Sequence, residues 1–578
     1  MLDLSRTSSL GEALRDATTT FKSREGLIEV DRHRESVRYS FSEIRRLAEG
    51  LGAALQGRGF APGDRCVILM QNQAKWPISA TAALWAGAVL VPLDYKLTTP
   101  EQLALLAHAR PRALVTEYST WEKLRDDGDP ALFERCLVIV TDAPEEASIA
   151  PALRWAPGDP AAFTYRPRER DDVACIVYSS GTGGTPKGCM LTHHNYLEQA
   201  QVLGQMYPMA EGDRYFSILP TNHAIDFMCG FLLPFMMGGA VVHQRTLRPA
   251  FIAATMHRFQ VTHIALVPTI LKNLEKKLRE KLDDLPKWQR LIVDGLLDLN
   301  EVATRRAPNH ALSSKLLRPL HETFGGKLRL IFAGGAFVER SVAEFFNRIG
   351  IPVAIGYGLT EAGTVLTVND LKPFRGDSVG RPVKGIEIEI RDANERGVGE
   401  VWARGPTIFM GYFEAPELTE AAIVDGWLRT GDLGLLDAAG HLKLLGRAKN
   451  MIVTEGGKNV YPEDIEALLG EIDGAEEIAV MAANFIWPRS TMVGEQLVLV
   501  LRPKNERSEH RHKGDDPLGD AVASLRRQNR SLADFKRLAG YVVWEHEFPR
   551  TASQKLKREI LAREIRDRLD RKRGVQEL

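Results

Sequence analysis

The sequence has few cysteines and no cysteine pair suited to a metal or redox site. The five cysteines are odd in number and far apart, and no CxxC motif joins any two of them: Cys66, Cys136, Cys175, Cys189 and Cys229. This spacing disfavours zinc-ribbon and thiol-redox proteins and is typical of reduced cytosolic thiols. We therefore expect free thiols and a cytoplasmic protein.

Net charge and long apolar runs are also lacking. Lysine plus arginine (75) equals aspartate plus glutamate (75), so no global field favours nucleic acid or an anionic membrane. The longest apolar run, residues 227–242, is shorter than the roughly 20 residues of a spanning helix and contains Pro234 and Gly238. Residues 1–26 lack the apolar core of a signal peptide. We expect a buried run, no nucleic-acid partner and at most peripheral membrane contact.

The composition and pattern indicate an α/β protein of more than one domain. The 578 residues are 44% hydrophobic and 26% charged, which is typical of soluble globular chains too long for one core. Apolar segments such as RCVILM and VLVPL alternate with helix-patterned segments, as in βαβ units. After Gly380 strands and turns alternate, which indicates an antiparallel β subdomain. We expect a large domain of mixed βαβ sheets with this β subdomain at 1–447, and a small α+β domain at 448–578.

A glycine-rich loop follows the predicted strand ACIVY. It reads SSGTGGTPKG from Ser179 to Gly188. Its glycines let backbone N–H groups approach an anion, while serine and threonine hydroxyls and Lys187 add donors and positive charge. It is not a Walker A loop, because there lysine follows glycine, whereas here Pro186 precedes Lys187. The loop suits phosphate, although such a loop by itself is equally compatible with a surface turn.

The loop closely resembles the signature of the adenylate-forming (AMP-binding) superfamily, which includes acyl-CoA synthetases, firefly luciferase and nonribosomal peptide adenylation domains. Further motifs follow in the family's order: LPTNHAIDF (219–227), AGGAFV (333–338), GYGLTEAG (356–363), GWLRTGDLG (426–434), GRAKNMIVTEGGKNVYPEDIE (446–466) and PRTASQKLKR (549–558). The resemblance spans nearly the whole chain. It implies the adenylate-forming fold, with a C-terminal domain that moves about a hinge at Lys449.

The resemblance also implies how ATP and Mg²⁺ bind. Adenine would pack on Tyr357, the ribose hydroxyls would bind Asp432 beside Arg447, and Mg²⁺ would lie near Thr182 and Glu361, as hard cations prefer oxygen ligands. Gly456 and Gly457 would line the approach of CoA. The full nucleotide and CoA set is Ser179, Ser180, Gly181, Thr182, Gly183, Gly184, Thr185, Lys187, Gly334, Gly335, Ala336, Gly356, Tyr357, Gly358, Leu359, Thr360, Glu361, Asp432, Arg447, Lys449, Gly456 and Gly457.

Three residues are implied to act in catalysis: His223, Lys187 and Lys555. A lone histidine is more often structural than functional, but His223 resembles the family histidine beside the acyl carboxylate. Asn222 stands where many relatives have an aromatic residue. The run after His223 would then line an acyl tunnel, or it forms ordinary core. Lys555 matches the lysine that bridges the carboxylate and the α-phosphate, with Lys557 as a rival.

The implied reaction is attack of a carboxylate on the ATP α-phosphorus, loss of pyrophosphate, and cleavage of the acyl-adenylate by a thiol. The charged insertion at 271–324 and the terminal motif resemble long-chain fatty acid CoA ligases. An acyl-carrier-protein ligase acting on a separate carrier, and a non-catalytic nucleotide-binding scaffold, remain as alternatives. The tail places Leu556, Ile560, Ile565 and Leu569 at near-helical spacing, which suits either packing on the small domain or contact with a membrane.

Overall fold

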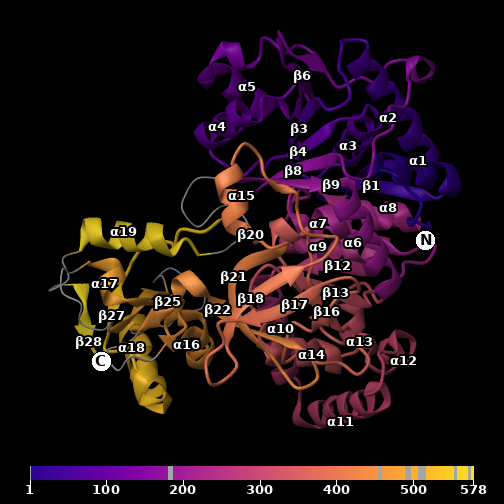
Figure 1. Ribbon diagram of the computed structural model, residues 1–578. Coiled ribbons are helices and arrows are strands. Elements are labelled where there is room, and N and C mark those ends of the chain that lie inside the picture. Colours follow the sequence, from indigo (N-terminus) through magenta and orange to yellow (C-terminus); the bar gives the residue numbers. More distant parts are fainter. Residues whose placement is uncertain are drawn as a thin grey trace. The chain divides into compact units, whose positions relative to one another are not determined.

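The computed structural model describes residues 2–179, 187–453, 459–488, 496–504, 516–551, 556–569 and 574–578 (Figure 1). The chain forms two compact units. Unit 1 comprises Met1–Ile388, Ala403–Leu428 and Gly440–Leu442, and unit 2 comprises Glu389–Trp402, Arg429–Ala439 and Lys443–Leu578. All five cysteines are buried and form no disulfide.

A nine-stranded sheet forms the centre of one half of unit 1. Its order is β16-β15-β14-β13-β12-β10-β11-β1-β2, and the central neighbours from β14 to β1 are parallel. The strands are β1 (Glu25–Asp31), β2 (Arg34–Ser40), β10 (Arg214–Ser217), β11 (Ala240–Gln244), β12 (His263–Leu266), β13 (Leu330–Gly334), β14 (Val353–Tyr357), β15 (Thr367–Val368) and β16 (Arg381–Pro382). As expected for parallel strands covered on both faces, β12 and β14 are short, almost wholly apolar runs.

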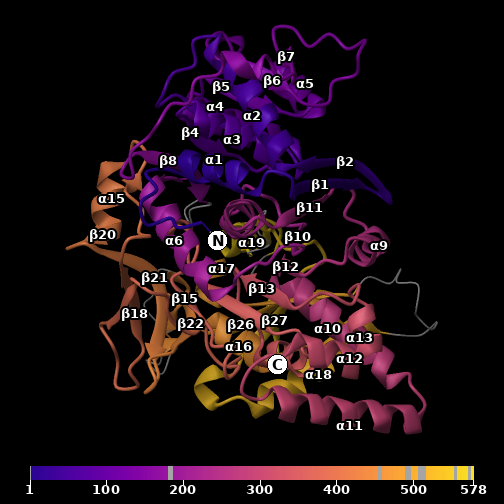
Figure 2. The same ribbon diagram turned by 90° about the vertical axis from the view of Figure 1, so that its right-hand side faces the viewer.

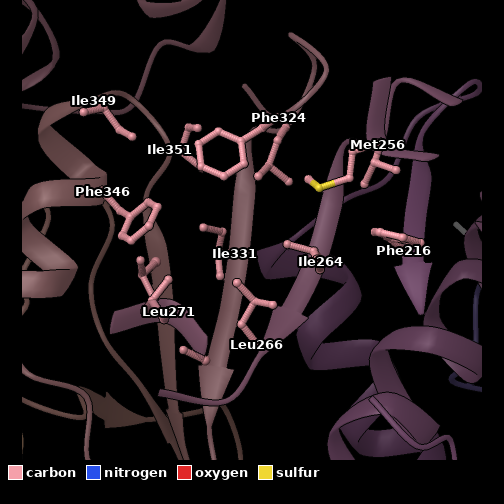
Figure 3. Close-up of a cluster of buried hydrophobic side chains, with 14 of the residues drawn as sticks. Phe216, Met256, Ile264, Leu266, Leu271, Phe324, Ile331, Phe346, Ile349 and Ile351 are labelled. Carbon is pink, nitrogen blue, oxygen red and sulfur yellow. The ribbon is translucent and has the colours of Figure 1, made fainter. Parts of the chain in front are cut away.

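Helices cover this sheet and complete its core. Side chains of β10, β12 and β13 pack with Leu271, Phe324 and Phe346 from the covering segments (Figure 3). These segments include α9 (Pro249–Phe259), α10 (Pro268–Asp283), α11 (Lys287–Thr304), α12 (His310–Leu316), α13 (Arg318–Glu322) and α14 (Arg340–Arg348). The predicted charged insertion is therefore a group of helices packed beside the sheet.

An eight-stranded sheet carries the glycine-rich motif. Its order is β19-β9-β8-β4-β3-β5-β6-β7, with strands β3 (Arg65–Leu69), β4 (Val89–Pro92), β5 (Ala113–Thr116), β6 (Leu137–Val140), β7 (Leu153–Arg154), β8 (Val173–Ser179), β9 (Lys187–Thr192) and β19 (Gly411–Tyr412). Strands β3 to β6 are parallel, whereas β9 is antiparallel to β8 and β19. Its helices include α2 (Phe41–Gln56), α3 (Lys75–Trp85), α4 (Thr99–Ala109) and α5 (Tyr118–Asp127).

The long apolar run lies inside unit 1, as predicted. It forms α7 (Ala224–Phe227), a π-helical turn η3 (Met228–Leu232), α8 (Leu233–Met237) and the start of β11. Every residue from Phe227 to Val242 is buried. Edge-to-face aromatic contacts run from Trp76 through Phe231 to Phe235 and Phe41. The nearby helices α1 (Leu10–Phe21) and α6 (His193–Met206) pack against α8.

The region after Gly380 is rich in strands, as predicted. A five-stranded sheet has the order β17-β18-β21-β20, with β22 against β21. Its strands are β17 (Glu387–Arg391), β18 (Gly399–Arg404), β20 (Ile423–Val424), β21 (Trp427–Leu436) and β22 (Leu442–Arg447), and the short helix α15 (Pro416–Ala422) precedes β20.

Unit 2 ends in a small α+β fold. Its four-stranded sheet has the order β25-β26-β27-β28, with β25 (Ala475–Ala482), β26 (Leu497–Pro503), β27 (Gly540–Val543) and β28 (Gln576–Glu577). The helices are α16 (Pro462–Leu469), α17 (Ala483–Ile486), α18 (Pro517–Ser531) and α19 (Arg558–Arg568). In the tail, Leu561 and Ile565 are buried in a cluster with Trp487 and Trp544, so the apolar face of α19 packs within unit 2.

None of the helices in the described ranges combines the length and the apolar character that crossing a membrane requires.

Candidate active site

The antiparallel β8–β9 hairpin flanks the glycine-rich loop. Ser179 ends β8 and lies opposite Lys187, the first residue of β9. The Cys189 thiol lies 3.8 Å from the Ser179 hydroxyl, toward which it donates. Residues Ser180, Gly181, Thr182, Gly183, Gly184 and Thr185, predicted to bind phosphate and Mg²⁺, lie outside the described residues.

Tyr412 connects the hairpin to the GYGLTEAG motif. Strand β19 pairs with β9, which sets Tyr412 opposite Cys189. The Lys187 ammonium nitrogen lies 5.0 Å from the centre of the Tyr412 ring, a distance suited to a cation–π contact. The Tyr412 hydroxyl donates to Glu361 Oε1 at 2.9 Å. Burial and the neighbouring Glu361 carboxylate raise the Tyr412 pKa well above its ordinary value, so the hydroxyl keeps its proton.

The carboxyl ends of β13 and β14 bring two glycine motifs together. Gly334 and Gly356 are partners in neighbouring parallel strands. A Cβ on Gly334 would lie 2.8 Å from the Gly356 carbonyl oxygen, and one on Gly358 would lie 2.1 Å from the Thr364 carbonyl oxygen. Gly335 has φ +80° in the turn that follows β13. These glycines thus allow close backbone packing around Tyr357, whose ring is buried.

The LPTNHAIDF motif lies against these strand ends. The Ile225 Cδ1 atom lies 3.4 Å from a Cβ built on Gly334. The Thr364 hydroxyl, next to the GYGLTEAG motif, donates to the Ala224 carbonyl at 3.3 Å. The structure therefore brings the motifs at 219–227, 333–338 and 356–363 to the same edge of the nine-stranded sheet. Ligands of open α/β sheets typically bind at such an edge.

His223 has a carboxylate neighbour that the sequence did not indicate. His223 precedes α7, and its Nε2 atom lies 3.3 Å from Asp94 Oδ2. Asp94 follows β4 and is buried. Burial by itself would raise the Asp94 pKa, but the His223 and Lys96 neighbours together hold that pKa below its ordinary value. A buried carboxylate beside the ring can hold the imidazole in one orientation.

Two further polar residues hold the loop that carries His223. The buried Asp226 carboxylate accepts hydrogen bonds from Tyr215, Ser217 and Thr221 at 2.8, 2.7 and 3.0 Å. Burial raises the Asp226 pKa to about 6. Asn72, from the segment after β3, donates to the Leu219 carbonyl at 2.6 Å and accepts from the Thr221 N–H at 2.9 Å. The position of His223 is thus fixed by both sheets of unit 1.

Unit 2 brings together two predicted ribose-binding residues. Arg447 Nε lies 2.6 Å from Asp432 Oδ1. The Asp432 N–H donates to Thr430 Oγ1 at 3.1 Å, and the Thr430 hydroxyl donates to the Val401 carbonyl at 2.7 Å. Lys449 lies in a short 3₁₀ turn, with only its backbone described. Gly456, Gly457 and Lys555 lie outside the described residues.

No cluster of three His, Cys, Asp or Glu side chains suited to a metal occurs within the described ranges. Mg²⁺ in nucleotide sites is commonly held by one or two carboxylates plus substrate phosphates. The Glu361 carboxylate and the hydroxyl of the preceding Thr360 are therefore a donor set that fits Mg²⁺ bound together with a nucleotide.

Sequence reasoning missed Tyr412, Asp94, Asn72 and Asp226. Asp226 carried a usable signal, because a lone carboxylate inside an apolar run must be buried with donors around it. Tyr412 and Asp94 carried none, since each meets its partner only through the pairing and packing of distant segments.

Comparison with known proteins adds a family match. Residues 14–413 match the model of the family described as AMP-binding enzyme. Long-chain-fatty-acid–CoA ligase FadD15 of Mycobacterium bovis is 30% identical over 445 residues, which are 74% of this chain and 71% of the relative. A CoA ligase of Rhodococcus jostii (strain RHA1), whose named acid is a methyl-dioxo-octahydro-indenyl propanoyl compound, is 29% identical over 469 residues, 77% of this chain and 81% of the relative.

A solved structure shares the fold. The o-succinylbenzoate coenzyme A synthetase of Bacillus subtilis, in complex with ATP and a magnesium ion, superposes with a TM-score of 0.69 and 23% identity. The match covers 94% of this chain and 98% of that chain.

Proposed function

We propose a substrate and a reaction for this chain, which belongs to the AMP-binding enzyme family and is an acyl-CoA ligase of the adenylate-forming type. The chain uses ATP and Mg²⁺ to activate a long-chain fatty acid and passes the acyl group to CoA. The observation that carries the ATP assignment is the Lys187–Tyr412–Glu361 arrangement beside the glycine-rich loop. It places a cation, which can bind phosphate, and a carboxylate, which can bind Mg²⁺, on either side of one tyrosine.

In the first half-reaction, an oxygen of the acid carboxylate forms a bond to the ATP α-phosphorus, and the bond from that phosphorus to the pyrophosphate oxygen breaks. Lys187 and the loop at 179–188 would hold the phosphates, and Glu361 would hold Mg²⁺ together with phosphate oxygens. Mg²⁺, when bound, neutralises charge on the phosphates. The products are an acyl-adenylate and pyrophosphate, so no side-chain nucleophile is needed.

His223 is proposed to position the acid. His223 precedes the buried run in the chain, and its Nε2 atom lies 3.3 Å from Asp94 Oδ2. An imidazole held in one orientation can bind a carboxylate and keep the attacking oxygen in line. The apolar run that follows His223 is packed against neighbouring side chains of unit 1 and by itself does not select the acid.

In the second half-reaction, the CoA sulfur attacks the acyl carbon, AMP leaves, and the thiol proton is released. We assign Asp432 and Arg447 to the ribose and Lys555 to the first half-reaction. We further assign Gly456 and Gly457 to the CoA approach, after rotation about Lys449 of the domain that we place at 448–578. Rotation of a domain between two half-reactions is a conformational step of the closure type.

The choice of a long-chain acid rests on sequence features and on one group of relatives. The helical insertion from α10 to α13 and the terminal motif resemble long-chain ligases, and FadD15 is named for such an acid. The Rhodococcus jostii relative is named for a bulky ring acid. Long-chain acids and ring acids are therefore the two classes of substrate to compare directly.

Acid-dependent exchange of labelled pyrophosphate into ATP, measured without CoA, tests the first half-reaction by itself. We expect exchange with a long-chain acid, and a large loss of exchange in Lys555→Ala but not in Lys557→Ala. Full exchange in Lys555→Ala would contradict the role given to Lys555, and absence of exchange with every acid would contradict the proposal.

A further inference from the structure

The Glu463 carboxylate contacts the chain on both sides of Lys449. Glu463 lies in the first turn of α16. Its Oε1 atom accepts a hydrogen bond at 2.7 Å from the side chain of Asn450, which directly follows Lys449. Its Oε2 atom is buried without a hydrogen-bond partner in the described chain, and a Cβ on Gly446 would lie 2.9 Å from it. The carboxylate therefore packs against the end of β22 and against the turn that follows.

Arg558, the first residue of α19, lies beside the same carboxylate. Its Nη2 atom lies 3.6 Å from Glu463 Oε1. The same nitrogen donates to both carboxylate oxygens of Glu466 at 2.9 Å, and Nη1 donates to the Val480 carbonyl at 2.9 Å. Helices α16 and α19 both belong to unit 2 and are labelled in Figure 2. Arg558 thus fastens the start of α19 to α16 and to β25.

Backbone pairing joins the two sides of the segment that carries Lys555. Arg550 and Leu556 form an antiparallel bridge. Arg558 follows this bridge by two residues and Lys555 by three. An anchor at Arg558 therefore holds one side of the bridge, and with it the point at which the chain leaves the Lys555 segment.

We propose that Glu463 is a positioning residue that joins the turn at Lys449 to the segment that carries Lys555. The inference rests on the proposed function, in which Lys555 serves the first half-reaction and a domain rotates about Lys449. Because one carboxylate holds Asn450 and faces Arg558, the start of the rotating domain and the anchor of Lys555 move together. Rotation at Lys449 then carries Lys555 to the reacting atoms in a defined position.

Glu463 and Glu466 have different parts in this link. Glu466 accepts two hydrogen bonds from Arg558 and one from the Val480 N–H. Among the described residues, it forms no hydrogen bond or ion pair with the turn at 448–450, whereas Glu463 does. Removal of the Glu463 carboxylate should therefore release Asn450 while Arg558 stays paired and unit 2 stays folded.

The first test compares Glu463→Ala with the parent in acid-dependent pyrophosphate exchange. We expect kcat to fall by about tenfold, because hydrogen bonds to a charged group are lost, while the KM for ATP stays close to that of the parent. In the Lys555→Ala background Glu463→Ala should cause no further loss, because both changes act through one group. Asp473→Ala, which removes an exposed ion pair with Arg527 in the same unit, should exchange as the parent does.

Two results of this test would overturn the inference. One is a kcat for Glu463→Ala equal to that of the parent. The other is a further loss of similar size when Glu463→Ala is added to Lys555→Ala, which is the result that a merely structural role predicts.

A second measurement does not depend on activity. Hydrogen–deuterium exchange of backbone amides, followed by mass spectrometry, should be severalfold faster in Glu463→Ala than in the parent at both 446–453 and 549–558, and unchanged in β26. Unchanged amide exchange in either range would overturn the inference. Absence of pyrophosphate exchange with every acid would contradict the proposed function, and the amide exchange would still show whether Glu463 joins the two segments.

Discussion

The hydroxyl of Tyr412 donates a hydrogen bond to the Glu361 carboxylate at 2.9 Å. The same ring lies 5.0 Å from the Lys187 ammonium nitrogen. Tyr412 comes from β19, a two-residue strand that pairs with β9. One aromatic side chain therefore sets the position of two charged groups that belong to separate sequence motifs.

Replacing Tyr412 by phenylalanine keeps the ring beside Lys187 and removes the hydrogen bond to Glu361. Hydrogen bonds to charged groups contribute about 1.5–3 kcal/mol, so we expect pyrophosphate exchange to fall by about tenfold or more. The control is Tyr118→Phe, which removes a tyrosine hydroxyl beside Glu122 on α5. Exchange rates that match in the parent and Tyr412→Phe would show that the hydrogen bond has no role in adenylation.

Replacing Glu361 by glutamine removes the charge but keeps an oxygen that can accept from Tyr412. We expect the Mg²⁺ concentration for half-maximal exchange to rise severalfold, because hard cations prefer a carboxylate to an amide. Glu414→Gln, which alters an exposed carboxylate paired with Arg110, should leave the Mg²⁺ dependence unchanged. If Glu361→Gln needed the same Mg²⁺ concentration for half-maximal exchange as the parent, Glu361 would not be a ligand of the metal.

Replacing Asp94 by asparagine removes the charge beside His223. If Asp94 positions the imidazole, kcat for adenylation should fall by about tenfold, while the KM for ATP stays close to that of the parent. If Asp94 only stabilised the fold, Asp94→Asn would lower the midpoint of thermal unfolding and would not lower kcat selectively while leaving the KM for ATP unchanged. Asp94→Asn with normal kcat would contradict the positioning role.

Acid should destabilise unit 1 partly through His243. This buried residue of β11 has no hydrogen-bond partner for either ring nitrogen among the described residues, and burial lowers its pKa to about 3. As pH falls below the ordinary histidine value, the unfolded chain binds a proton that the folded chain does not. Stability is therefore lost between about pH 6.5 and 3, by about 2 kcal/mol at pH 5 from this one group.

The variant His243→Leu tests this pH dependence. Urea unfolding followed by tryptophan fluorescence at pH 7.5 and pH 5 should show a smaller loss of stability in the variant than in the parent. His257→Leu replaces an exposed histidine and should behave as the parent does. An equal acid sensitivity in His243→Leu and the parent would refute the account of His243.

The sequence predicted the main strands because buried parallel strands are short runs of apolar residues, as VAIGY of β14 shows. The motifs that carry Lys187 and Glu361 are distinctive, so both residues could be proposed from the sequence, and the structure places both beside Tyr412. The sequence could not indicate Tyr412 or Asp94, because strand pairing and sheet packing bring them to their partners.

The most direct test of the central claim is product identification by mass spectrometry. The purified protein would be incubated with ATP, Mg²⁺, CoA and carboxylic acids from acetate to long-chain fatty acids and ring acids. We predict that long-chain acyl-CoA forms together with AMP and pyrophosphate. Acyl-CoA formed only from a ring acid would contradict the fatty acid assignment, and an acyl-adenylate that persists with CoA present would contradict transfer to CoA.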